Sequence, residues 1–134
     1  NRELIALSAQ VAEPKSLQHP DAKATAISVI CGSEVTIELS LKDGKVEEVG
    51  YAVEACSLTK AVVAIMARAA CGKTRPEISA AAAALRDMLE KESRPPAGDW
   101  TALKILEPVI GYKARHETIM LPFVAVEKAF AGVK

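Results

Sequence analysis

The sequence predicts an α+β fold, in which helices pack on one face of a small three-stranded antiparallel sheet. Residues 34–41 alternate polar and apolar side chains, which is typical of a strand with one buried face. Asp43-Gly44 follows, a strong signal for a hairpin turn. After Cys56, alanine-rich segments place their apolar residues at helical spacing instead. We expect one domain over residues 1–134, in the order helix, sheet, helices.

The first part of the chain supplies one helix and two strands. Apolar residues at helical spacing predict a helix over Glu3–Ala12, which Pro14 ends. A polar loop over Glu13–Lys23 follows. Ala24–Ile30 then adds a strand before the amphipathic strand Glu34–Leu41.

The return strand of the hairpin covers Lys45–Glu54. Its apolar residues share one face except for Val46, which lies out of phase with the others. One extra residue in a strand corrects such a phase error, so we expect a β-bulge near Glu47-Glu48.

Two long helices are predicted after the sheet. The first covers Ser57–Cys71, and we expect Gly72 to close it as a C-terminal cap. Thr74-Arg75-Pro76-Glu77 has the pattern of a capping box with proline near the first helical position. It opens a second helix that runs to about Glu92.

The last part of the chain contains two further helices. Asp99 is placed to cap a short helix through Leu106, which Pro108 interrupts. A final helix covers Ile119–Ala131, for which Thr118 is the expected N-cap.

Composition excludes several classes of protein. The chain has 17 basic and 17 acidic residues, and this zero net charge argues against a basic face that binds nucleic acid. No apolar run approaches the roughly 18 residues that a membrane span needs. An odd number of cysteines, 3, without a signal-peptide pattern predicts a reducing, cytoplasmic compartment. The sequence begins at Asn1 and not at a methionine, which is compatible with an N-terminal leader that has been removed.

Cys31 and Cys56 are the candidate functional residues. Cys31 precedes the amphipathic strand, and Cys56 follows the return strand, so the hairpin brings both to one end of the sheet. The helix N-terminus at Cys56 favours its thiolate. Two thiolates supply half of a tetrahedral metal site, although free cysteines are also common as small core residues. Cys71 is expected to pack at the far helix end, about 22 Å from Cys56 along the helix.

Four motifs in order resemble the NifU N-terminal-like iron–sulfur cluster assembly scaffolds of the IscU/SufU type. The resemblance covers the chain from about Cys31 to Phe130. The motifs are Cys31-Gly32-Ser33, Glu54-Ala55-Cys56-Ser57-Leu58-Thr59, Gly72-Lys73-Thr74 and Tyr112-Lys113-Ala114-Arg115-His116-Glu117-Thr118.

The resemblance implies a metal-binding end. Cys31 and Cys56 match the first two ligand cysteines of the family, and Arg115 matches the basic residue before the third. Thr118 stands where the family has that third cysteine.

Three other positions near the cysteines carry a residue different from the one that is typical of the family. Ser33 replaces an aspartate, and Ala55 replaces a glycine. Glu117 falls where many members have histidine, so Glu117 or the adjacent His116 is a candidate to complete a site for zinc or a cluster.

The resemblance implies a carrier rather than an enzyme. The implied function is an iron–sulfur cluster assembly scaffold that binds iron, a cluster or zinc through Cys31 and Cys56. A cysteine desulfurase and other assembly proteins are the implied partners. Two alternatives remain: a relative without metal that serves as a partner-binding module, and a sulfur carrier that uses Cys56 as its nucleophile.

Overall fold

The computed structural model describes residues 1–133 and contains the predicted antiparallel sheet, with strand order β1-β2-β3. The strands are β1 (Ala22–Ile27), β2 (Glu34–Lys42) and β3 (Lys45–Glu54). Asp43 and Gly44 both have positive φ, 55° and 76°, as a tight two-residue hairpin requires. Ser40 pairs with Glu48 and Leu41 pairs with Val46. The residue skipped is Glu47, which confirms the predicted bulge.

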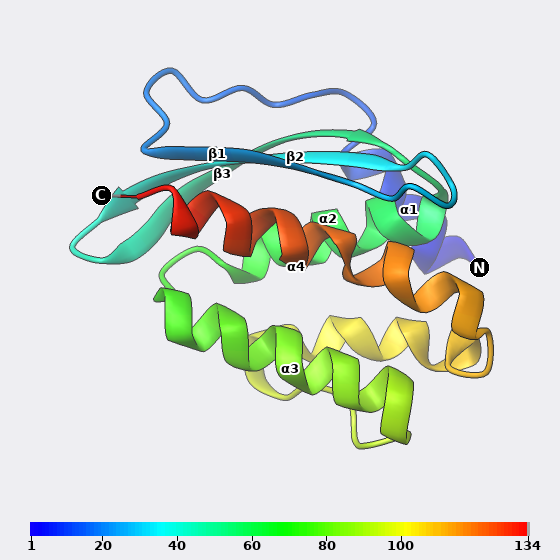
Figure 1. Cartoon of the computed structure of the whole chain (residues 1–134). Helices are drawn as coiled ribbons and strands as arrows, with labels where there is room; N and C mark the ends of the chain where they lie inside the picture. Colours follow the sequence, from blue (N-terminus) through cyan, green and yellow to red (C-terminus); the bar gives the residue numbers. More distant parts are fainter. Residues whose placement is uncertain (134) are drawn as a thin grey trace.

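The helices form two layers on one face of the sheet (Figure 1). Helices α2 and α4 lie against the strands, whereas α3 and the 3₁₀ segment η1 form the outer layer; α1 packs beside α2. The bounds are α1 (Arg2–Gln10), α2 (Ser57–Ala69), α3 (Arg75–Lys91), η1 (Gly98–Val109), the short 3₁₀ turn η2 (Lys113–Arg115) and α4 (His116–Ala131). This is the α+β architecture that the sequence predicts.

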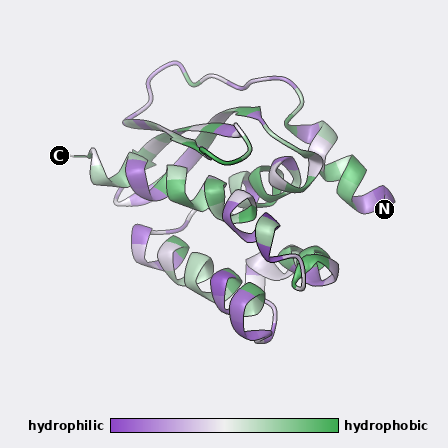
Figure 2. Cartoon of the chain, turned by 45° about the vertical axis from the view of Figure 1, so that its right-hand side comes forward, coloured by the Kyte–Doolittle hydropathy of each residue, from purple (hydrophilic) through white to green (hydrophobic). Residues whose placement is uncertain are grey.

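Burial follows the apolar pattern of each element. Val35, Ile37 and Leu39 of β2 are fully buried, because alternate residues of a strand face the helices. Helix α3 alternates polar and apolar colours in Figure 2, as expected for a helix with one face in the core. The rings of Trp100 and Phe123, with centroids 5.7 Å apart, join η1 to α4. No helix of residues 1–133 is both long enough and apolar enough to span a membrane.

The predicted capping box of α3 is confirmed. Thr74 accepts a hydrogen bond from the amide of Glu77, and the Glu77 carboxylate accepts one from the amide of Thr74. These two bonds satisfy amides that the first helical turn leaves without intrahelical partners.

The predicted N-cap roles of Thr118 and Asp99 are wrong. Helix α4 begins at His116, because the 3₁₀ turn η2 leads directly into it, so Thr118 lies buried inside the first turn. The segment after Gly98 is a 3₁₀ helix that continues to Val109. Asp99 does not cap it, and its carboxylate instead lies 2.7 Å from the Lys73 ammonium.

The end of α2 also differs from the prediction. The helix ends at Ala69 with Ala70 as its C-cap. Gly72 lies beyond the cap at φ 83°, where its amide donates to the Val46 carbonyl at 2.8 Å. This bond turns the chain toward β3, and it leaves Cys71 exposed instead of packed.

Candidate functional site

Cys31 lies in a tight loop, residues 28–33, between β1 and β2. The loop is closed by two backbone hydrogen bonds, from the Ser28 amide to the Ser33 carbonyl and from the Gly32 amide to the Ser28 carbonyl, each 2.8 Å long. Gly32 has φ 73°, a conformation that glycine adopts without strain. The loop holds the Cys31 thiol in an exposed position at the end of the sheet.

Cys56 is the N-cap residue of α2, as predicted from its position after the return strand. Its Sγ lies 3.6 Å from Thr59 Oγ1. The Thr59 hydroxyl donates to the Thr118 carbonyl at 3.2 Å, which ties the start of α2 to α4.

One cavity of about 310 Å³ brings the two cysteines together. Three further predicted site residues line it, namely Ser33, Arg115 and Thr118. Cys31 Sγ lies 3.0 Å from Ser33 Oγ and 3.4 Å from Thr118 Oγ1. The β1–β2 loop, the start of α2, the η2 turn and the first turn of α4 therefore each contribute a side chain to one pocket.

The surroundings of Cys31 favour its thiolate. The nearby hydroxyls of Ser28, Ser33 and Thr118 lower the pKa of the Cys31 thiol to about 6. The thiol is exposed, so little desolvation opposes this effect. Cys31 is consequently a thiolate at neutral pH.

The pKa of the Cys56 thiol is also lowered, but here burial opposes the effect of hydrogen bonds and charge. Partial burial raises the pKa of its thiol, but the Thr59 amide and hydroxyl, the Leu58 amide and the Arg115 charge together outweigh that burial. The two amides belong to the first turn of α2, which agrees with the sequence-based expectation for a helix N-terminus.

His116 and Glu117 lie outside the cavity that the two cysteines share. Both line a separate cavity of about 440 Å³ beside α3. His116 Nε2 is 2.8 Å from the Ile110 carbonyl oxygen, and the Glu117 carboxylate accepts a hydrogen bond from Ser28 Oγ at 2.7 Å. Neither side chain lines the cysteine pocket in this structure, and their role as ligands remains a prediction.

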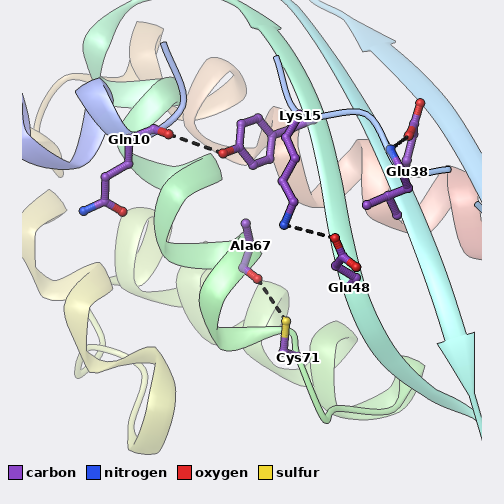
Figure 3. Close-up of polar contacts among 8 residues, drawn as sticks. Gln10, Lys15, Glu38, Glu48, Ala67 and Cys71 are labelled. Carbon is purple, nitrogen blue, oxygen red and sulfur yellow. Dashed lines mark hydrogen bonds and ion pairs between the residues drawn. The ribbon is translucent and has the colours of Figure 1, made fainter. Parts of the chain in front are cut away.

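Cys71 lies beyond the end of α2 opposite to Cys56. Its thiol donates to the Ala67 carbonyl at 3.4 Å, near an ion pair of 3.4 Å between Lys15 and Glu48 (Figure 3). As expected, Cys71 does not share a cavity with the other two cysteines.

Two hydroxyl residues near the cysteines, Ser28 and Thr59, were not predicted as part of the site. Ser28 and Thr59 are almost fully buried, with exposed fractions of 1% and 0%. Thr59 carries a signal, since a hydroxyl three residues after an N-cap lies near that residue. Ser28 carries none, because its partner Glu117 is 89 residues away.

The donor set is incomplete for a metal held by one chain alone. Among residues 1–133, no group of three or more His, Cys, Asp or Glu side chains is arranged to hold a metal ion. The pocket is lined by two thiols, two hydroxyls, one guanidinium and the Glu54 carboxylate. The thiols suit two positions of a tetrahedral zinc or iron site, whereas a neutral hydroxyl is a weak replacement for the third thiolate.

Solved structures resemble the chain over nearly its whole length. A nitrogen-fixing NifU-like protein (N-terminal) from Brucella abortus has 36% identity and a TM-score of 0.92, covering 99% of this chain and 92% of its own. A protein described as an iron–sulfur cluster assembly scaffold for the SUF system from Fervidobacterium islandicum AW-1 has 18% identity and a TM-score of 0.86, covering 96% and 94%. A hypothetical protein with 21% identity and a TM-score of 0.82, covering 98% of each chain, has the same fold.

No protein-family model and no curated protein matches the chain. The assignment therefore depends on the structural relatives, and the Brucella protein combines 36% identity with coverage of almost the entire domain. The chain belongs to the NifU N-terminal-like family, of the IscU/SufU type.

Proposed function

We propose that this protein is an iron–sulfur cluster assembly scaffold whose cargo binds at the Cys31–Cys56 pocket. The observation that carries the proposal is the pocket itself, in which two thiols with lowered pKa line one cavity at the end of the sheet. The fold neighbours described as NifU-like and as a cluster assembly scaffold support the same role. The protein acts as a carrier, and its cargo is iron, a nascent cluster or zinc.

Three side chains of the pocket have a role in this proposal. Cys31 and Cys56 supply soft, negatively charged donors, which iron and zinc prefer. Arg115 offsets part of the negative charge, and its charge already lowers the pKa of Cys56. The remaining coordination positions are filled from outside the chain, by inorganic sulfide, by solvent or by a partner protein such as a cysteine desulfurase.

Anaerobic reconstitution tests the proposal. The purified full chain is incubated with ferrous iron and sulfide, or separately with zinc, and bound metal is measured after desalting. We expect wild type to retain metal, and Cys31→Ser and Cys56→Ser each to lose most of it. Cys71→Ser is the matched control, because it removes an exposed thiol outside the pocket. Equal retention by all four proteins, or none by wild type, would falsify the proposal.

A second candidate function is sulfur transfer, favoured by the exposure and low pKa of Cys31. The Cys31 thiolate would attack the outer sulfur of a partner's persulfide. A new S–S bond forms at Cys31, the donor's S–S bond breaks, and the donor leaves as a thiolate, so no external oxidant is required. The structure favours Cys31 over Cys56 for this step because Cys56 is partly buried.

Mass spectrometry distinguishes this candidate. After incubation with a desulfurase and cysteine, the peptide containing Cys31 should gain the mass of one sulfur atom, and Cys31→Ser should abolish the gain. A gain on Cys56 or Cys71 alone would contradict the assignment to Cys31.

A further inference from the structure

The loop that carries Cys31 buries almost no apolar side chain against the domain. Ile27, which precedes the loop, and Val29 and Ile30 within it are large and apolar, yet their exposed fractions are 62%, 95% and 85%. Cys31 and Gly32 are exposed as well. Only Ser28 and Ser33, at 1% and 7%, are buried in this segment. Polar contacts of these two serines therefore hold the loop against the domain.

Ser28 connects the cysteine loop to α4. Its hydroxyl donates to Glu117 Oε1 at 2.7 Å, and its oxygen lies 3.5 Å from the Cys31 amide nitrogen, which donates to it. Ser28 also takes part in both backbone bonds that close the loop. A single buried serine thus joins the backbone of Cys31 to a carboxylate on another element.

Glu117 is placed to hold this connection. It lies in the first turn of α4, next to Thr118, whose hydroxyl is 3.4 Å from Cys31 Sγ. The N-terminal turn of a helix favours a negative side chain, so the carboxylate is stabilised where it accepts the bond. A hydrogen bond to a charged acceptor is stronger than one between neutral groups.

We propose that Glu117 is a positioning residue, which acts through Ser28 to hold the Cys31 loop on α4 and so keeps the Cys31 sulfur beside Thr118 and Cys56. This inference rests on the proposed role of the Cys31–Cys56 pair. It assigns Glu117 a function without direct contact with the cargo. The carboxylate faces Ser28 and the cavity beside α3, and it does not line the cysteine pocket.

The test measures how well the two thiols are arranged, without metal. Phenylarsine oxide binds two neighbouring thiols together and releases water, so its affinity depends on their arrangement. Wild type should bind one equivalent, and Glu117→Ala should lower the affinity by roughly tenfold, the range expected when a hydrogen bond to a charged group is lost. Glu117→Gln keeps an acceptor oxygen and should restore most of the affinity.

Helix α4 offers a matched control. Glu127 accepts a hydrogen bond from Ser79 of α3 in a similar serine–glutamate pair that lies outside the cysteine pocket. Glu127→Ala removes this bond and an ion pair with Arg75 from the same helix, and it should leave arsenical binding unchanged. Hydrogen exchange supplies a second readout, in which the Ser28 and Gly32 amides should exchange faster in Glu117→Ala alone.

Two outcomes would overturn the inference. One is equal arsenical affinity and equal loop exchange in wild type and Glu117→Ala. The other is an equal loss in Glu127→Ala, which would indicate a general loss of stability. Metal loading tests the proposed function separately: if the variants bind the arsenical as expected but wild type retains no metal, the positioning role stands and the scaffold proposal fails.

Discussion

Thr118 Oγ1 lies 3.4 Å from Cys31 Sγ, on the wall of the cavity that Cys31 shares with Cys56. Thr118, which stands where the family has its third cysteine, therefore lies beside the cysteine pair, but it carries a hydroxyl in place of a thiol. A third metal ligand could be placed at this position of the pocket, but Thr118 does not supply a thiolate.

Replacing Thr118 by cysteine should raise metal affinity. The substitution introduces a third soft donor beside Cys31, and because the two side chains are similar in size, it should cost less than about 1.5 kcal/mol of stability. Zinc competition with a chromophoric chelator measures the gain. Thr25→Cys is the control, because Thr25 pairs with Thr36 in the sheet and does not line the pocket. Equal zinc affinity in wild type and Thr118→Cys would contradict the prediction.

The alkylation rate of Cys31 should depend on pH with a midpoint near 6. The folded protein lowers the pKa of this thiol, so the reactive thiolate persists at neutral pH and is protonated only as the pH falls through about 6. Ser33→Ala should shift the midpoint upward, because it removes a hydroxyl 3.0 Å from the sulfur. Iodoacetamide labelling with peptide mapping measures both. A midpoint near the ordinary value of 9.0 in wild type would refute this account of Cys31.

Phe123→Ala should destabilise the domain by about 3–5 kcal/mol, the usual cost of emptying a large aromatic site in a core. Phe123 is 2% exposed and contacts the Trp100 ring across the helical layers. Urea unfolding measures the free-energy change. Val124→Ala, on the same helix but 40% exposed, should cost far less. A similar loss for both variants would mean that the α4–η1 contact is not a centre of the core.

Gly50→Ala should also destabilise the fold, by more than about 1 kcal/mol, because an added Cβ would lie 2.7 Å from the Lys15 carbonyl oxygen. This close approach accompanies the backbone bonds between Lys15 and Tyr51, which fasten the segment after α1 to β3. Thermal unfolding compares it with Gly111→Ala, where a Cβ meets nothing within 4 Å. Equal midpoints in the two variants would contradict the packing described for β3.

Local patterns predicted most of the fold. Alternation over Glu34–Leu41, the turn at Asp43-Gly44 and the phase error at Val46 each have a local cause, so the hairpin and its bulge could be predicted. The N-cap role of Thr118 was wrong because the 3₁₀ turn before α4 starts the helix earlier than its apolar pattern does.

The candidate site could be predicted only in part. The hairpin brings Cys31 and Cys56 to one end, which follows from topology alone. The contact between Ser28 and Glu117 joins residues 89 positions apart, and no periodicity or spacing signals such a pair. The family resemblance makes Glu117 a ligand candidate, which stays a prediction, and the structure adds its hydrogen bond to Ser28.

X-ray absorption at the zinc edge, on the zinc-loaded full chain, tests directly whether Cys31 and Cys56 bind metal. We expect sulfur ligands at about 2.3 Å in wild type, the usual zinc–thiolate distance. The sulfur contribution should fall in Cys31→Ser and in Cys56→Ser, remain in Cys71→Ser, and vanish in the double variant of Cys31 and Cys56. Zinc bound in wild type without sulfur ligands, or with a sulfur shell that survives the double replacement, would mean that the two cysteines are not the metal ligands.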